Sequence, residues 1–93
     1  MMSGYSNILV VTGTSSAVQF PKLPVNRVMF QVPIQNGISI NGSWMGIGTS
    51  QDAGYFALYN GDNSGWIECY DLSQFWYKSL ESADGTIVVW VNY

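Results

Sequence analysis

The sequence contains no histidine, and this absence removes most of the enzyme classes that a small domain can host. Without imidazole there is no Ser-His-Asp triad, no Cys-His nucleophile pair and no histidine-based metal site. Six carboxylates remain, but most of them fall in expected turns, where a solvated carboxylate is the ordinary outcome. We therefore expect a non-enzymatic protein without catalytic residues, cofactor or bound metal.

Charged side chains are also scarce. They make up 10% of the chain, whereas about 25% is typical of soluble domains. The basic residues are Lys22, Arg27 and Lys78, too few to neutralise a run of phosphates, which argues against a nucleic-acid partner. Because 47% of the residues are hydrophobic and 15% are aromatic, much of the surface must be neutral or aromatic, and other proteins tend to cover such surfaces. The composition predicts a component of an assembly.

Disulfides and long apolar runs are missing as well. Cys69 is the single cysteine, so no disulfide can form within the chain, and we interpret it as a small buried apolar residue. The N-terminal stretch Met1–Gly13 has no basic segment, and its apolar run Ile8–Val11 is too short for a signal peptide or a membrane span. We expect the chain to be made in the cytosol and to have no membrane partner.

The rest of the sequence consists of short runs rich in β-branched and aromatic residues, separated by Gly, Pro, Asn and Asp. This pattern predicts an all-β domain, a β-sandwich of about eight short, mostly antiparallel strands, of which a jelly roll is one form. We expect a single domain over residues 8–93, preceded by a flexible N-terminal arm of residues 1–7. The predicted strands are Ile8–Thr12, Ser16–Phe20, Arg27–Ile34, Ile38–Ile40, Ser43–Gly48, Tyr55–Leu58, Gly65–Tyr70, Phe75–Leu80 and Thr86–Asn92.

Two segments alternate clearly. Between Arg27 and Ile34 every second residue, beginning with Val28, is apolar and is expected in the core, and Pro33 marks an edge or the end of that strand. Along Thr86–Asn92 the alternation sorts the residues into two faces, and both faces are apolar enough to be covered.

The segment DLSQFWYKSL carries two conflicting patterns. Leu72, Phe75, Trp76 and Leu80 recur at the spacing of a helix face, with Asp71 as a candidate N-cap. The aromatic richness of the same residues favours a strand from Phe75 to Leu80. The strand is the preferred interpretation, and the helix stays open.

The stretch NGDNSGWIECYD, residues 60–71, follows the spacing of an EF-hand calcium loop. It begins with Asn60 where a carboxylate is required, ends with Asp71 in place of the bidentate Glu, and follows a Gly54-bearing flank that is a poor helix. We interpret it as a turn that leads into a strand. In that strand Ile67 and Cys69 point inward, and Trp66, Glu68 and Tyr70 point outward.

A second short motif, Gly46-Ile47-Gly48, contains part of a dinucleotide fingerprint. It is followed by Thr-Ser-Gln-Asp and not by a helix, so we interpret it as a bend in a strand.

The order of runs VVTGTSSAVQFPKLPVNRVMFQVPIQNG, WMGIGTS, AGYFALYNGD, DLSQFWYKSL and ADGTIVVWVNY resembles that of small structural proteins of tailed-phage virions, notably head-decoration or cement proteins. The resemblance spans Ile8–Tyr93 and consists of strand order and turns. The family usually has a Pro-Gly or similar turn where this chain has Leu58–Asp62, and the proline is absent here.

The resemblance implies a virion location and a homo-oligomer, a trimer or a dimer, bound to the major capsid protein. An alternative function is a receptor- or carbohydrate-binding module of a phage tail or fibre that uses exposed aromatic rings. Residue type suggests the contact residues for either function, two from the arm and the rest aromatic: Tyr5, Asn7, Trp44, Trp66, Tyr70, Trp76 and Trp90.

Overall fold

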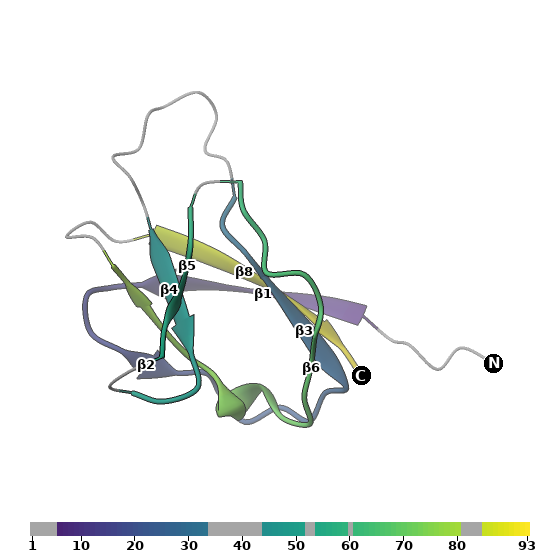
Figure 1. Ribbon diagram of the computed structural model, residues 1–93. Helices are drawn as coiled ribbons and strands as arrows, with labels where there is room; N and C mark the ends of the chain where they lie inside the picture. The colour runs from purple at the N-terminus through teal and green to yellow at the C-terminus, as the bar shows by residue number, and fades with distance from the viewer. Residues whose placement is uncertain (1–5, 34–43, 52–53, 60, 81–84) are drawn as a thin grey trace.

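The computed structural model describes residues 6–33, 44–51, 54–59, 61–80 and 85–93. Within these residues the chain is all-β, as the sequence predicts, apart from one short 3-10 helix (Figure 1). The elements in chain order are β1 (Ser6–Gly13), β2 (Val18–Gln19), β3 (Arg27–Gln31), β4 (Met45–Gly48), β5 (Phe56–Leu58), β6 (Ile67–Glu68), η1 (Leu72–Gln74), β7 (Trp76–Ser79) and β8 (Gly85–Asn92).

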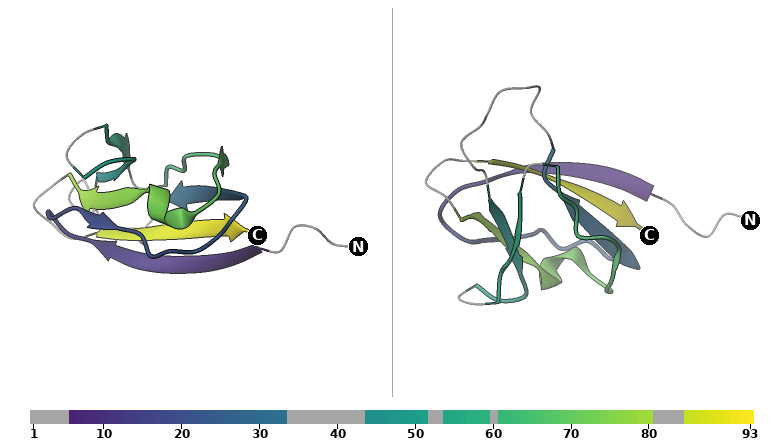
Figure 2. Two further views of the ribbon diagram at one scale, coloured as in Figure 1. Left: turned by 90° about the horizontal axis from the view of Figure 1, so that it is seen from below. Right: turned by 45° about the horizontal axis from the view of Figure 1, so that its top comes forward.

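The strands form two four-stranded antiparallel sheets. Sheet A has the order β1-β8-β3-β6, and sheet B has the order β2-β7-β4-β5. The first strand pairs with the last, the second with the seventh, the third with the sixth and the fourth with the fifth, as in one long hairpin that has been rolled up. This is the strand order of a jelly roll. Figure 2 shows the two layers, with β1 and β8 on one side and β4 and β5 on the other.

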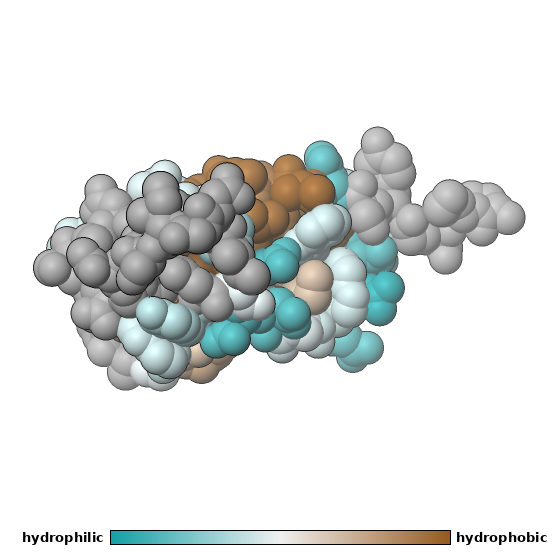
Figure 3. Space-filling view, turned by 90° about the horizontal axis from the view of Figure 1, so that it is seen from above, coloured by the Kyte–Doolittle hydropathy of each residue, from teal (hydrophilic) through white to brown (hydrophobic). Residues whose placement is uncertain are grey.

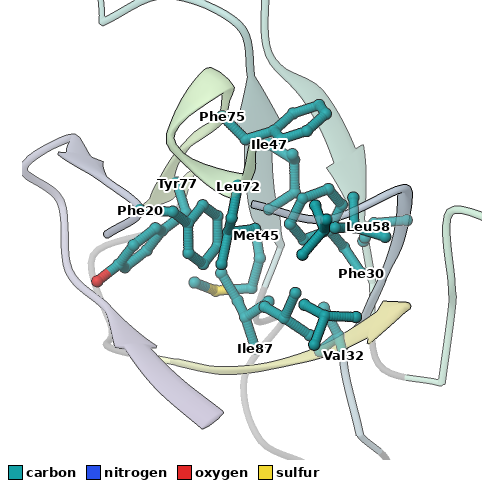
Figure 4. Close-up of a cluster of buried hydrophobic side chains, with 14 residues drawn as sticks. Phe20, Phe30, Val32, Met45, Ile47, Leu58, Leu72, Phe75, Tyr77 and Ile87 are labelled. Carbon is teal, nitrogen blue, oxygen red and sulfur yellow. The ribbon is translucent and has the colours of Figure 1, made fainter. Parts of the chain in front are cut away.

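The hydrophobic core lies between the two sheets. Alternation along β3 and β8 explains it, since Val28, Phe30 and Val32 are buried and so is every second residue of β8. Aromatic rings link the layers: the centroid of Phe30 is 5.2 Å from that of Phe75 in an edge-on arrangement. Figure 4 shows side chains from both sheets meeting in this space. Strand β3 ends at Gln31, earlier than the predicted Ile34, and Pro33, which has no N–H to donate, follows two residues later.

Several strand boundaries differ from the predicted ones. Strand β1 begins at Ser6, so Ser6 and Asn7, which the sequence assigns to the arm, pair with Asn92 and Val91 of β8. The strands predicted at Ser16–Phe20 and Gly65–Tyr70 shorten to two residues each, Val18–Gln19 and Ile67–Glu68. Ile34 and the strand predicted at Ile38–Ile40 lie outside the described residues.

Both patterns in DLSQFWYKSL are present in succession. Asp71 caps the short helix η1, and strand β7 follows from Trp76 to Ser79. Phe75 and Tyr77 are buried while Trp76 and Lys78 are half-buried, as the strand interpretation predicts. The helical spacing therefore reflects a single 3-10 turn and does not continue into the strand.

The aromatic ring of Tyr55 packs against the two glycines of β4, Gly46 and Gly48. A Cβ atom at Gly48 would lie 3.0 Å from Cδ1 of Tyr55, and one at Gly46 would lie 3.2 Å from the same atom. The Lys78 ammonium lies 4.5 Å from the Tyr55 ring centroid. The Tyr55 ring thus packs on Gly46 and Gly48 on the outer side of sheet B. This close approach explains why glycine stands at both positions, since a larger residue would collide with the ring.

Candidate assembly surface

The polar side chains of the stretch NGDNSGWIECYD bind the chain's own backbone. The Tyr59 N–H donates to Oδ2 of Asp62 at 3.0 Å, and the Gly65 N–H donates to Oδ1 of Asn63 at 2.9 Å. The turn is hydrogen-bonded to β3 and the residue after it, because the Ser64 N–H donates to the carbonyl of Phe30 at 2.8 Å and the Gly61 N–H donates to the carbonyl of Val32 at 2.8 Å. Within the described ranges, no group of three or more His, Cys, Asp or Glu side chains is arranged to hold a metal ion.

Asp71, the last residue of that stretch, is a helix cap. Its Oδ1 accepts hydrogen bonds from the Ser73 N–H at 2.9 Å, the Ser73 hydroxyl at 2.7 Å and the Leu23 N–H at 3.1 Å. In return Oε1 of Gln74 accepts from the Asp71 N–H at 3.0 Å, which completes a capping box. The hydrogen bonds from Ser73 hold the pKa of the Asp71 carboxyl below its usual value. Asp71 therefore joins η1 to the segment before β3.

The side chains that follow this turn alternate as predicted. Ile67 and Cys69 pack against the core, whereas Trp66 and Tyr70 are exposed by 43% and 77%. The Arg27 guanidinium carbon lies 4.5 Å from the Trp66 ring centroid, so a cation covers one face of that ring. Burial raises the pKa of the Cys69 thiol, which lowers its thiolate fraction and its reactivity.

The remaining predicted contact residues do not gather in one place. Trp44, before β4, is 40% exposed and packs against Tyr59 with ring centroids 4.7 Å apart. Trp76 is half-buried in sheet B, and Trp90 is half-buried in sheet A, where its Nε1 donates to Oε1 of Gln31 at 3.0 Å. Asn7 is exposed in β1, and Tyr5 lies outside the described residues. The aromatic residues are therefore distributed over both sheets.

One coherent apolar surface is not indicated by residue type alone. The register sets Ile8, Trp90 and Met29 side by side across three strands, and it sets Val10 beside Val88 in the next row. Since Val89 and Phe30 point into the core, these five side chains point away from it. We call Ile8, Val10, Met29, Val88 and Trp90 the outer face of sheet A. Figure 3 shows strongly hydrophobic residues gathered on the side of the molecule where β1 and β8 lie.

The outer face ends at a long edge strand. Strand β1 has eight residues and pairs only with β8 within the described parts of the chain, whereas the other edge strands, β6, β2 and β5, have two or three residues. Ile8 and Val10 are exposed by 47% and 65%. The strand contains neither proline nor a charged residue, which are the usual protections of a free edge.

The described residues enclose no pocket, so the candidate site is a surface and not a cavity. Among them, no helix has the length and apolar character needed to cross a membrane.

Comparison with known proteins identifies a relationship of fold. The sequence matches no protein-family model, and no curated protein matches it. A solved structure described as "Bacillus endospore appendages form a novel family of disulfide-linked pili" is similar to this chain, with a TM-score of 0.50 and 10% sequence identity. The similarity covers 97% of this chain and 85% of the other. The described β architecture is therefore shared with a pilus protein.

Proposed function

We propose that this chain is a non-enzymatic structural subunit that assembles with copies of itself at a surface outside the cell that makes it. The observation that carries the proposal is the outer face of sheet A together with the uncharged edge of β1. A lone domain gains nothing from exposing Ile8 and Val10 by 47% and 65%, whereas an assembly buries them and gains the hydrophobic free energy of that burial.

The similarity to a pilus protein supports the same function. A fold by itself hosts many functions, but a pilus subunit is a non-enzymatic protein that works through repeated contacts, and this chain combines that architecture with a surface suited to them. The pili in the similar structure are described as disulfide-linked. This chain has only Cys69, which is half-buried, so its own assembly would rest on non-covalent contacts.

Decoration of a tailed-phage head is the second candidate, and the ring pair of exposed Trp44 and half-buried Tyr59 favours it. This pair lies beside sheet B, away from the outer face of sheet A, and offers a second surface for a major capsid protein. In that case the chain would be a trimer or dimer on the virion. A carbohydrate-binding module is less well supported, because Arg27 covers Trp66 and the rings are spread over both sheets.

Sedimentation velocity and electron microscopy of the purified full chain over a range of concentrations test the main proposal. We expect oligomers or regular polymers for the wild type. Val10→Lys should shift the chain to monomers without unfolding it, since Val10 is exposed and lysine is a natural protection of free edges. The matched control is Val18→Lys, which alters an exposed valine on the edge strand of sheet B. A wild type that stays monomeric at every concentration would overturn the proposal.

Binding to isolated phage shells separates the second candidate from the first. Saturable binding to shells that Trp44→Ala removes and Val10→Lys leaves intact would favour decoration. Self-assembly without shells, with no change caused by Trp44→Ala, would favour a polymer.

A further inference from the structure

We propose that two copies of this chain pair through β1, antiparallel to each other, around a two-fold axis that passes beside Leu9. The two copies of sheet A would then form one continuous sheet with one continuous apolar outer face. This inference rests on the proposed function, and it adds the partner segment and the register.

The direction of the backbone groups of β1 is the first step. The Ile8 N–H donates to Oδ1 of its neighbour Asn7 at 2.8 Å and not to β8. In an antiparallel ladder the residues that face a given partner alternate along the strand. Ser6, Ile8, Val10 and Thr12 therefore direct their N–H and C=O groups to the free edge, and the residues between them direct theirs to β8, which lies beside the whole of β1.

The register is the second step. A ladder forms only where outward-facing residues of one copy oppose outward-facing residues of the other, so the axis must pass beside a residue and not between two. With the axis at Leu9, Ser6 opposes Thr12 and Ile8 opposes Val10, so every outward-facing residue of β1 is paired. With the axis at Val10, Ser6 would oppose a residue beyond the end of the strand. The Leu9 register therefore forms the most hydrogen bonds.

The choice of a second β1 as the partner is the third step. The strand contains no charged residue, so two copies meet without like-charge repulsion even though the chain has a net charge of −3. The edge at the other side of sheet A, β6, has two residues and carries Glu68, and it is too short to cover β1. On the outer face, β-branched Ile8 would lie against Val10 of the other copy, which is a favourable cross-strand pair.

Cysteine cross-linking tests this register in the Cys69→Ser background, which removes the native thiol. In the Leu9 register, Leu9 opposes itself as a non-hydrogen-bonded pair. The Cα atoms of such a pair are about 4.5 Å apart, which is within the range that a disulfide spans. Leu9→Cys, oxidised in air with copper phenanthroline, should give a covalent dimer on a non-reducing gel that dithiothreitol reverses.

The matched controls use the same face of the same strand. Val11→Cys alone should cross-link at least 10-fold less, because its own copy lies about four residues away along the strand, on the order of 13 Å. A mixture of Asn7→Cys and Val11→Cys should cross-link efficiently, since these residues oppose each other. Asn7 is exposed, so this pair retains a test if Leu9→Cys does not fold.

The possible outcomes are distinct. Cross-linking of a mixture of Leu9→Cys and Val11→Cys, with neither reacting alone, would place the axis at Val10 and overturn the register. Oligomers by sedimentation with no cross-link at any of these positions would overturn pairing through β1 and leave the proposed function standing. A monomer in sedimentation with no cross-link would overturn both.

Discussion

Phe30 and Met29 are neighbours on β3 whose side chains lie on opposite sides of sheet A, and replacing each by alanine should separate folding from assembly. Phe30 is fully buried, and its ring centroid lies 5.4 Å from that of Phe20 and 5.2 Å from that of Phe75. Phe→Ala in a core costs about 3–5 kcal/mol. Small domains have only about 5–15 kcal/mol of stability, so Phe30→Ala should remove a large part of it.

Met29 lies on the outer face of sheet A and is half-buried. Met29→Ala leaves the core between the sheets intact, and we expect a loss of about 1 kcal/mol or less in the free energy of unfolding of the monomer. In an assembly that packs on the outer face of sheet A, as the proposed function requires, the same side chain would be covered. Met29→Ala should therefore weaken assembly at least as much as it weakens folding, whereas Phe30→Ala should act on folding.

Two measurements distinguish these effects. Thermal unfolding in dilute solution, below the concentration at which sedimentation detects oligomers, should show a fall in Tm on the order of 20 °C for Phe30→Ala and of a few degrees for Met29→Ala. Sedimentation at high concentration and low temperature, where both variants are folded, should show the larger loss of oligomer for Met29→Ala. If Met29→Ala lowers the Tm of the monomer as much as Phe30→Ala does, the outer face is already covered within one chain and the reasoning fails.

Three further predictions concern single features. Gly48→Ala should lower stability by about 1–3 kcal/mol, because its Cβ would lie 3.0 Å from Tyr55; an unchanged Tm would mean that the ring moves aside freely. Since Ser73 lowers the pKa of Asp71 in the folded state, this carboxylate should stabilise the fold above its ordinary pKa of about 3.9 and lose that effect as pH falls through the folded value. Asp71→Asn should flatten the dependence of Tm on pH in that range, and an unaltered dependence would contradict the cap. Dithiothreitol should not dissolve the assemblies, and Cys69→Ser should assemble like the wild type; dissociation on reduction, or covalent dimers of the wild type on a non-reducing gel, would show that Cys69 links subunits.

The local sequence pattern was sufficient to predict the buried residues of a strand where one side of that strand is much more apolar than the other. The alternation between Arg27 and Val32 predicted the buried residues of β3 and the buried residue after it, whereas the strand ends at Gln31 and not at the predicted Ile34. Asp71 was predicted as a candidate cap because it directly precedes the helical spacing that begins at Leu72, and the structure adds Gln74 as its partner in a capping box. The helical spacing of residues 72–80 holds over one short turn, since η1 spans Leu72–Gln74 with Phe75 as its C-cap, and Trp76 and Leu80 lie beyond the helix.

The candidate surface was not predictable in the same way. In the run Ile8–Val11 every residue is apolar, so the sequence does not tell which side chains face the core. The answer depends on pairing with β8, at the opposite end of the chain, and a shift of one residue in that register would exchange the two faces. The aromatic candidates were chosen by type, and type does not reveal that Trp90 is engaged by Gln31 or that Arg27 lies over Trp66.

The topology itself explains why an apolar edge should be found on β1. Among the described residues, pairing first with last and second with seventh leaves the first strand at the end of one sheet, with a neighbouring strand on one side only. Three of the four sheet edges that the described residues form are short, with two or three residues each, which limits the number of unpaired backbone groups. The fourth extends over eight residues without a charge. In a monomer, the unpaired backbone groups of such an edge could pair with the edge of any other chain and cause aggregation. Pairing with one defined partner strand prevents this, because the same backbone groups then hold the assembly together.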